Sequence, residues 1–167
     1  SVASLVVALA ACSGAQHRAS LPWHPRQGPT MDQLLNVHRA SSPTLSSDGS
    51  AMGFLSDAAG LPQAYAVRVL AEGAAPEAAW RRLVSATERV QYLAWSPSGA
   101  SVLFGRDTGG DENTQIFRVA PDGGEASAVT RAGAKTLFGA ISDDGRTLAY
   151  ASNERSPADF DIYVRPL

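Results

Sequence analysis

One short pattern occurs three times along the chain, and its spacing restricts the fold more than any other feature of the sequence. Each copy has a serine, a glycine three residues later and then an apolar run. The turn glycines are Gly49, Gly99 and Gly145, so successive copies lie 50 and 46 residues apart. A period of about 40–50 residues with four strands per unit is typical of β-propeller blades. We therefore predict an all-β chain built from such blades.

Short apolar segments bounded by Gly, Pro, Ser and Asp indicate the strands of each blade. Trp95 and Phe104 belong to these segments, and we expect them to be core anchors between blades. The predicted strands are 43–46, 51–56, 64–70 and 80–84 in the first blade, 92–96, 101–106, 115–120 and 126–130 in the second, and 138–142, 147–152 and 161–165 in the third. The third blade therefore lacks its outermost strand. The expected architecture is a partial propeller of about three antiparallel blades, with the third incomplete.

So few blades do not close a ring, because propellers use about 4–8 of them. An unclosed arc leaves the two end blades with uncovered apolar faces and open edges. We therefore expect residues 30–167 to be the first blades of a propeller in a longer protein.

Composition excludes several classes of function. The chain has 167 residues, of which 44% are apolar and 18% charged, as in an ordinary globular domain. Its formal net charge of −2 gives no reason to expect a nucleic-acid partner. A single cysteine excludes an internal disulfide and a cysteine metal cluster. We predict no metal site and no cofactor.

The first 29 residues differ from the repeats. Residues 1–12, SVASLVVALAAC, are an apolar run too short to span a bilayer, but suited to a signal segment. Small residues before Cys12 resemble the lipobox of bacterial lipoproteins, in which the cysteine thiol carries the lipid. A buried strand, or an ordinary signal segment with a chance cysteine, is the alternative. Residues 13–29, rich in Pro and polar residues, are predicted to be a flexible linker.

A short helix is predicted over residues 30–39, TMDQLLNVHR. Thr30 and Gln33 form a capping-box pattern, and Ser-Ser-Pro at 41–43 ends the helix.

A polar loop in the second blade holds the candidate site residues. They are Arg106, Asp107, Asp111, Glu112 and Asn113. Three carboxylates around two glycines could hold a cation or the amine of a substrate at the central cavity. A solvated turn, with glycine supplying positive φ, is the alternative that we favour. The spacing does not fit an EF-hand loop. We also expect an ion pair between Arg106 and the neighbouring acids, which contributes little if exposed.

Three segments resemble the propeller of bacterial prolyl-oligopeptidase-family serine peptidases, a family that includes dipeptidyl and acylaminoacyl peptidases. They are residues 31–49 (MDQLLNVHRASSPTLSSDG), 106–117 (RDTGGDENTQIF) and 142–150 (SDDGRTLAY), and the resemblance covers 31–167. Ser47 stands where the family usually has proline. The last unit is shared with many other propellers, including those of the TolB type.

The resemblance implies a propeller that covers an α/β-hydrolase domain and admits only short peptides. That hydrolase carries a Ser-Asp-His triad, whose histidine follows a Gly-x-Ser-x-Gly nucleophile. The 167 residues hold no such motif, and His17, His24 and His38 all precede the repeats. We therefore predict no catalytic residue in this chain, although the whole protein would be a serine peptidase. Its expected partners are short peptides and, through a lipid anchor, the membrane on the periplasmic side of the cell envelope. A non-enzymatic, TolB-like propeller that binds envelope proteins is the alternative.

Overall fold

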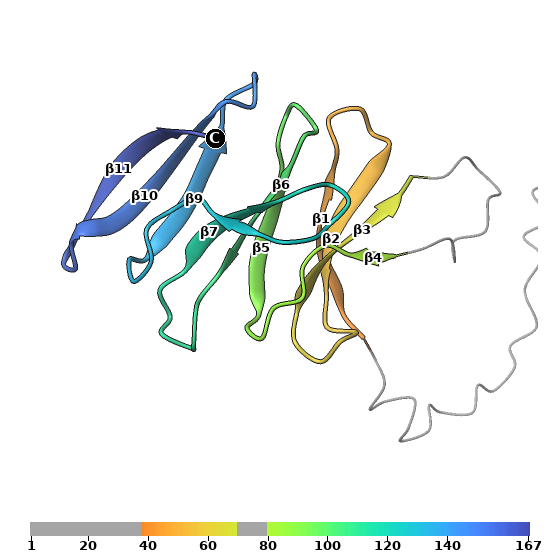
Figure 1. Cartoon of the computed structure of the whole chain (residues 1–167), viewed down its shortest axis with the longest axis horizontal. Coiled ribbons are helices and arrows are strands. Elements are labelled where there is room, and N and C mark those ends of the chain that lie inside the picture. Colours follow the sequence, from red (N-terminus) through yellow and green to blue (C-terminus); the bar gives the residue numbers. More distant parts are fainter. Residues whose placement is uncertain (1–37, 70–79) are drawn as a thin grey trace, which may run out of the picture. The chain divides into compact units, whose positions relative to one another are not determined.

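A computed structural model of the chain describes residues 38–69 and 80–167, which lie in one compact unit, Val37–Leu167. These described ranges contain β-strands and turns and no helix. The strands form three separate antiparallel sheets that follow one another along the sequence (Figure 1). The prediction of an all-β, partial propeller is confirmed.

Each sheet is a simple meander in which neighbouring strands pair in chain order. The first sheet contains β1 (Ala40–Leu45), β2 (Ala51–Ser56), β3 (Gln63–Arg68) and β4 (Arg81–Arg82), the second contains β5 (Val90–Trp95), β6 (Val102–Arg106), β7 (Gln115–Val119) and β8 (Ser127–Ala128), and the third contains β9 (Thr136–Ile141), β10 (Thr147–Ser156) and β11 (Asp159–Pro166). Within the described residues β11 has no fourth strand beside it, as predicted.

Several strand bounds differ from the prediction, and β1, for example, begins at Ala40 instead of residue 43. The fourth strands β4 and β8 have only two residues each, and Leu83 and Val84, which follow β4, are buried in the core between sheets. Strand β10 continues to Ser156, four residues beyond its predicted end at residue 152. A register shift between Ser152 and Ser156 accommodates this extension opposite β11.

The predicted helix over residues 30–39 falls almost entirely outside the described residues. Its last two residues, His38 and Arg39, are described and lie in irregular structure before β1. The predicted signal segment and linker, including Cys12, also fall outside the described residues. Among the residues that the structure describes, no helix is long and apolar enough to cross a membrane.

The three repeated turns have the same backbone geometry. In each turn the glycine amide donates to the carbonyl oxygen of the serine three residues earlier, at 2.8–2.9 Å. The glycine φ angles of 69°, 70° and 71° lie in the left-handed region, which favours glycine. These values belong to Gly49, Gly99 and Gly145 in that order. The spacing read from the sequence is therefore a true structural repeat.

Side chains close the turns in a similar way. Asp48 accepts hydrogen bonds from the hydroxyls of Ser46 (2.6 Å) and Ser50, and these bonds lower the pKa of Asp48 to about 2. In the second turn a serine replaces the aspartate, and its hydroxyl lies 2.8 Å from that of Ser96. This residue is Ser98, so the turn keeps a polar closure without a carboxylate.

An aromatic pair stacks across the second and third strands of every sheet, counted in chain order. The pairs are Phe54–Tyr65, Phe104–Phe117 and Tyr150–Tyr163, with ring centroids 5.8, 5.6 and 5.4 Å apart and interplanar angles of 21°, 18° and 17°. The first member of each pair follows the turn glycine by five residues. Because the three pairs are equivalent, they define which residues correspond from blade to blade.

Cores form between sheets rather than within them. Phe104 and Phe117 of the second sheet pack with Leu55, Ala64 and Ala66 of the first. The predicted anchors Trp95 and Phe104 both belong to this core, so that prediction is confirmed.

The second and third sheets repeat this arrangement. There Tyr150 and Leu148 pack with Leu103 and Ile116. Each sheet therefore presents its aromatic pair to the preceding sheet and its other face to the following one.

Candidate functional site

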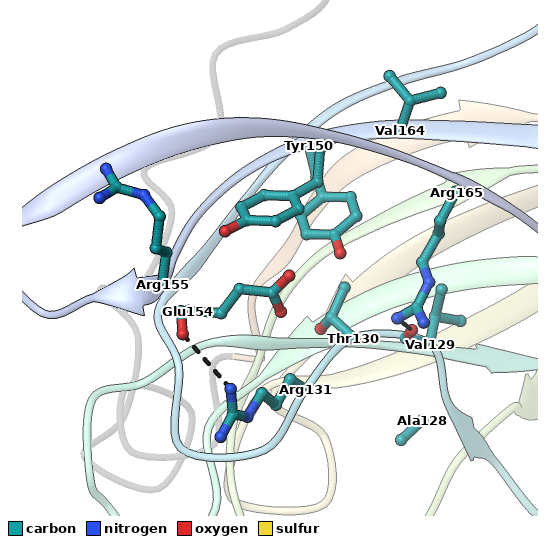
Figure 2. Close-up of a pocket in the computed structure, with 10 residues that line it drawn as sticks. Ala128, Val129, Thr130, Arg131, Tyr150, Glu154, Arg155, Val164 and Arg165 are labelled. Carbon is teal, nitrogen blue, oxygen red and sulfur yellow. Dashed lines mark hydrogen bonds between the residues drawn. The ribbon is translucent and has the colours of Figure 1, made fainter.

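One cavity in the described part of the chain lies beside the third sheet. It has a volume of 770 Å³ and is open to solvent (Figure 2). Three arginines line it, and each donates a hydrogen bond to another group of the chain. Arg131 donates to the carbonyl oxygen of Glu154 at 3.4 Å, and Arg165 donates to that of Val129. Arg155 donates to the Asp161 carboxylate at 3.0 Å.

This cavity follows from the strand count of the third sheet. In the first two sheets a fourth strand pairs with the second aromatic residue and its successor, namely Tyr65–Ala66 and Phe117–Arg118. The equivalent residues in β11, Tyr163 and Val164, line the cavity. The hollow therefore borders an open strand edge and does not have the shape of an enclosed ligand site.

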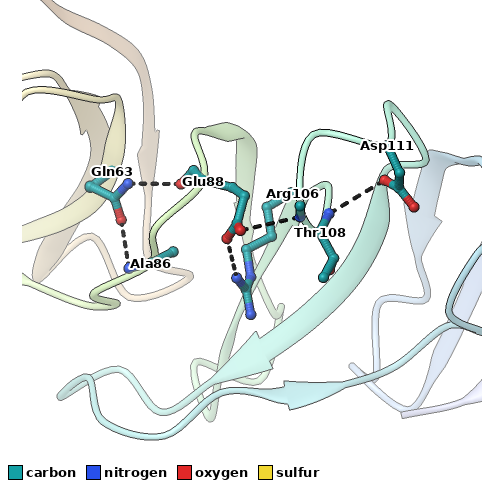
Figure 3. Close-up of polar contacts among 7 residues, drawn as sticks. Gln63, Ala86, Glu88, Arg106, Thr108 and Asp111 are labelled. Carbon is teal, nitrogen blue, oxygen red and sulfur yellow. Dashed lines mark hydrogen bonds and ion pairs between the residues drawn. The ribbon is translucent and has the colours of Figure 1, made fainter.

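A polar cluster at one end of the second blade is the better candidate (Figure 3). Its centre is the ion pair between Arg106 Nη1 and Glu88 Oε2, 3.0 Å apart and largely shielded from solvent, with 24% and 20% of the side chains exposed. The Arg106 guanidinium also lies over the Phe117 ring, 4.4 Å from its centroid, where a cation–π interaction adds to the ion pair. Arg106 therefore joins the aromatic core to the polar end of the blade.

Glu88 ties the loop after β6 to the segment before β5. Its second carboxylate oxygen, Oε1, accepts a hydrogen bond from the backbone amide of Gly109 at 3.2 Å. Hydrogen bonds from the Thr87 side chain and from this amide hold the pKa of Glu88 below its usual range. The carboxylate is therefore charged at neutral pH, as its partner Arg106 requires.

The cluster extends into the first blade through Gln63, which is buried at the start of β3. Its Nε2 donates to the carbonyl oxygen of Glu88 at 2.9 Å, and its Oε1 accepts from the amide of Ala86 at 3.0 Å. A buried amide with both ends bonded fixes the path of the chain between two blades. The Asp107–Asn113 region is thus anchored, through Glu88, to two sheets.

The tip of this loop is exposed and acidic. The Asp111 carboxylate accepts from the amides of Asn113 (3.0 Å) and Thr108 (3.4 Å), and the Asn113 amide bond lowers the pKa of Asp111. Gly109, Gly110 and Glu112 have φ angles of 65°, 74° and 59°. The backbone therefore turns sharply here, and the carboxylates of Asp111 and Glu112 lie at the surface.

The predicted site residues are only partly brought together. Arg106 pairs with Glu88 and not with Asp107 or Glu112, neither of which has an ion-pair partner among the described residues. This corrects the expected pairing of Arg106. Asp111 and Asn113 bond to each other through the backbone and side chains, at 3.0 and 3.4 Å.

Sequence reasoning missed Glu88 and Gln63. The signal for Glu88 was present in the hairpin register, because Val90 pairs with Arg106 across β5 and β6. A residue two positions before Val90 emerges on the same side of that strand, beside Arg106. In the ranges 38–69 and 80–167, no group of three or more His, Cys, Asp or Glu residues could hold a metal ion.

Hydrogen exchange in the loop after β6 should report whether the Glu88–Arg106 ion pair holds that loop in place. We expect Glu88→Gln to accelerate hydrogen exchange at the Gly109 amide several-fold, because a neutral acceptor binds that amide and Arg106 less strongly. Asp122→Asn is the matched control, since Asp122 forms an exposed ion pair with Arg81 at 2.7 Å on another loop. Equal exchange at Gly109 in all three proteins would show that Glu88 does not hold the loop.

Comparisons with known proteins support the fold. No protein-family model matches the chain, and no curated protein matches it. Among solved structures, a putative TolB of Agrobacterium tumefaciens is 19% identical and has a TM-score of 0.58, with 77% of this chain and 45% of that one aligned. TolB of Acinetobacter baumannii is 22% identical with a TM-score of 0.53, and the alignment covers 75% and 29% of the two chains.

A puromycin-hydrolysing peptidase of Mycobacterium tuberculosis is also similar. It is 19% identical, has a TM-score of 0.60, and is aligned over 78% of this chain and 22% of its own length. The chain thus spans less than half the length of each of these three solved structures. These likenesses establish the propeller fold, which TolB proteins and a peptidase share.

Proposed function

We propose that this chain is the substrate-gating part of a serine peptidase that hydrolyses short peptides. The observation that carries the proposal is the acidic loop tip, held in place by the Glu88–Arg106 ion pair. Every unblocked short peptide carries a protonated α-amino group, and exposed carboxylates attract this positive charge. Asp111 and Glu112 supply those carboxylates in this proposal.

Two other observations support the same function. The loop belongs to residues 106–117, a segment that resembles prolyl-oligopeptidase-family propellers. A peptidase is among the solved structures with the same fold. In this proposal the bond-cleaving serine, aspartate and histidine belong to an α/β-hydrolase domain of the whole protein. Cys12 would carry the lipid that places the protein at the cell envelope.

A covalent probe tests the enzymatic part of the proposal. Fluorophosphonates react with activated serines, so we expect them to label the gene product read on to its natural stop codon. The 167-residue chain should remain unlabelled. An extended product that takes no label would overturn the peptidase proposal.

Kinetics on the extended product test the role of the loop. Asp111→Asn combined with Glu112→Gln should raise KM several-fold for dipeptides with a free amino group and leave kcat unchanged. The same dipeptides with an acetylated amino group are the control, and their KM should not change. An equal effect on both substrates would remove the loop from substrate recognition.

A TolB-like propeller that binds proteins is the second candidate function. It is favoured by the two TolB structures, which align with three quarters or more of this chain. The probe separates the candidates, because a binding propeller has no activated serine to label.

A further inference from the structure

The first hairpin of the second blade ends differently from the first hairpin of the other two blades. Corresponding residues are identified by strand pairing, because Ser56, Arg106 and Ser152 each pair with the first residue of the innermost strand of their sheet. Those innermost strands are β1, β5 and β9. An arginine in the second blade therefore stands where the other two blades have a serine.

In the first and third blades the next residue along the chain closes this hairpin with two hydrogen bonds. Asp57 accepts a bond from the amide of Arg39 at 2.7 Å, and its own amide donates to the Arg39 carbonyl oxygen at 3.3 Å. Asn153 makes the same two bonds with Lys135, at 2.7 and 3.2 Å. We call this pair of bonds the hairpin bracket. A carboxylate forms it in one blade and a carboxamide in the other.

The second blade has a residue suited to the bracket but does not form it. Asp107 and Arg89 occupy the corresponding positions, and within 38–69 and 80–167 neither the Asp107 carboxylate nor the Arg89 amide takes part in a hydrogen bond. Glu88 binds the loop instead, through Arg106 and the amide of Gly109 (Figure 3). We call these two contacts of Glu88 the latch.

The latch residues belong to the second blade alone. At the position of Glu88 the first blade has His38 and the third has Ala134, so neither blade has an acid there. Both members of the ion pair are thus particular to the one described blade that lacks the bracket. The second sheet packs against the first and against the third, so this arrangement is seen with both neighbouring sheets in place.

We infer that the loop after β6 has two states and that the Glu88–Arg106 ion pair selects between them. In the state described above, the latch holds Gly109 and leaves the Asp107 carboxylate without a bond to the described chain. In the second state the latch is broken, and Asp107 forms with Arg89 the bracket that the other blades have. One carboxylate loses an amide hydrogen bond and another gains one, so the exchange of hydrogen bonds is nearly balanced.

The two states differ in the charge that the loop presents to a ligand. The first state leaves the carboxylate of Asp107 available beside those of Asp111 and Glu112. The second state binds it to the backbone of the preceding segment. The inference holds for either candidate function, since it concerns the loop and not the identity of its ligand.

Residues taken from the other blades test the inference. Glu88→Ala combined with Arg106→Ser removes the latch and leaves no unpaired charge behind. In the 167-residue chain, hydrogen exchange measured by NMR at the Arg89 amide should then slow about five-fold, the protection expected from one added hydrogen bond. Exchange at Gly109 should become faster, because its acceptor is lost. Adding Asp107→Ala to this variant should return the Arg89 amide to its original rate.

Two single substitutions calibrate the measurement. Asp57→Ala should accelerate exchange at the Arg39 amide about five-fold, because it removes an existing bracket. Asp107→Ala in the otherwise unchanged chain should leave exchange at Arg89 as it was. If Asp107→Ala instead accelerates exchange at Arg89 as much as Asp57→Ala does at Arg39, the bracket is already formed and the inference is wrong.

An unchanged Arg89 rate in the double variant would also overturn the inference. The β-bulge at Gln91, where the pairing shifts between Val90 and Tyr92, would then be what keeps this hairpin end open. Exchange at the Phe104 amide, within β6, shows whether each variant keeps the folded blade. Glu88→Gln provides the same comparison with both side chains retained. It should slow exchange at Arg89 by a smaller factor, and an unchanged rate there would contradict the two-state loop even if the double variant did not fold.

Discussion

Phe104→Ala is expected to lower the free energy of unfolding by about 3–5 kcal/mol, the usual cost of removing a buried aromatic ring. Phe104 is completely buried, stacks on Phe117 and packs against the first sheet. Its loss opens a cavity between two blades, and the rigid ladders on both sides limit how far the structure can close it. Urea denaturation followed by circular dichroism measures the change.

Phe104→Leu is the matched control, because leucine keeps most of the apolar volume and should retain most of the stability. A loss below about 1 kcal/mol for Phe104→Ala would mean that the core between the first two blades does not hold the domain together. Equal losses for both substitutions would assign the effect to ring stacking and not to the cavity.

Gly105→Ala is the second large expected effect, with a loss of about 1–3 kcal/mol from overpacking. A Cβ at Gly105 would lie 2.1 Å from Cε1 of Tyr92, which is far inside van der Waals contact. The Tyr92 ring is opposite Gly105 in the β5–β6 pairing and packs against Phe138 of the third sheet. The ring is held between two blades, so it cannot move away without disturbing the second interface.

A double-mutant cycle tests this cause directly. In a Tyr92→Ala background the added methyl group no longer meets a ring, so Gly105→Ala should cost little there. Thermal or urea unfolding of the four proteins gives the coupling energy. Equal costs of Gly105→Ala in both backgrounds would place the strain in the backbone and not in the contact with Tyr92.

Much of the fold could be predicted from local chemistry. The turns at Gly49, Gly99 and Gly145 need positive φ, and that requirement leaves a readable signal in the sequence. The bounds of β2 were predicted without error, because a turn glycine and a polar loop limit the strand on both sides. The bounds of the short outer strands were not, because Leu83 has the apolar character of a strand residue although β4 ends at Arg82.

The candidate site was harder to predict, since its contacts cross between segments. Arg106 and the loop were recognised, but the acid that binds Arg106 lies 18 residues earlier. Sequence proximity favoured Asp107 as the ion-pair partner of Arg106. The pairing of Val90 with Arg106 instead places Glu88 beside the guanidinium. Gln63 gave no local signal, because its two hydrogen bonds depend on how one blade follows another.

The direction in which the aromatic pairs are covered has a consequence for how the chain is made. Phe104 and Phe117 pack against a sheet that leaves the ribosome before them, and Tyr150 packs against the sheet synthesised just ahead of it. Each newly translated sheet can therefore pack on a sheet that has already been synthesised. The aromatic rings are therefore buried in the order in which they are synthesised. This order shortens the time for which apolar surface is exposed to solvent.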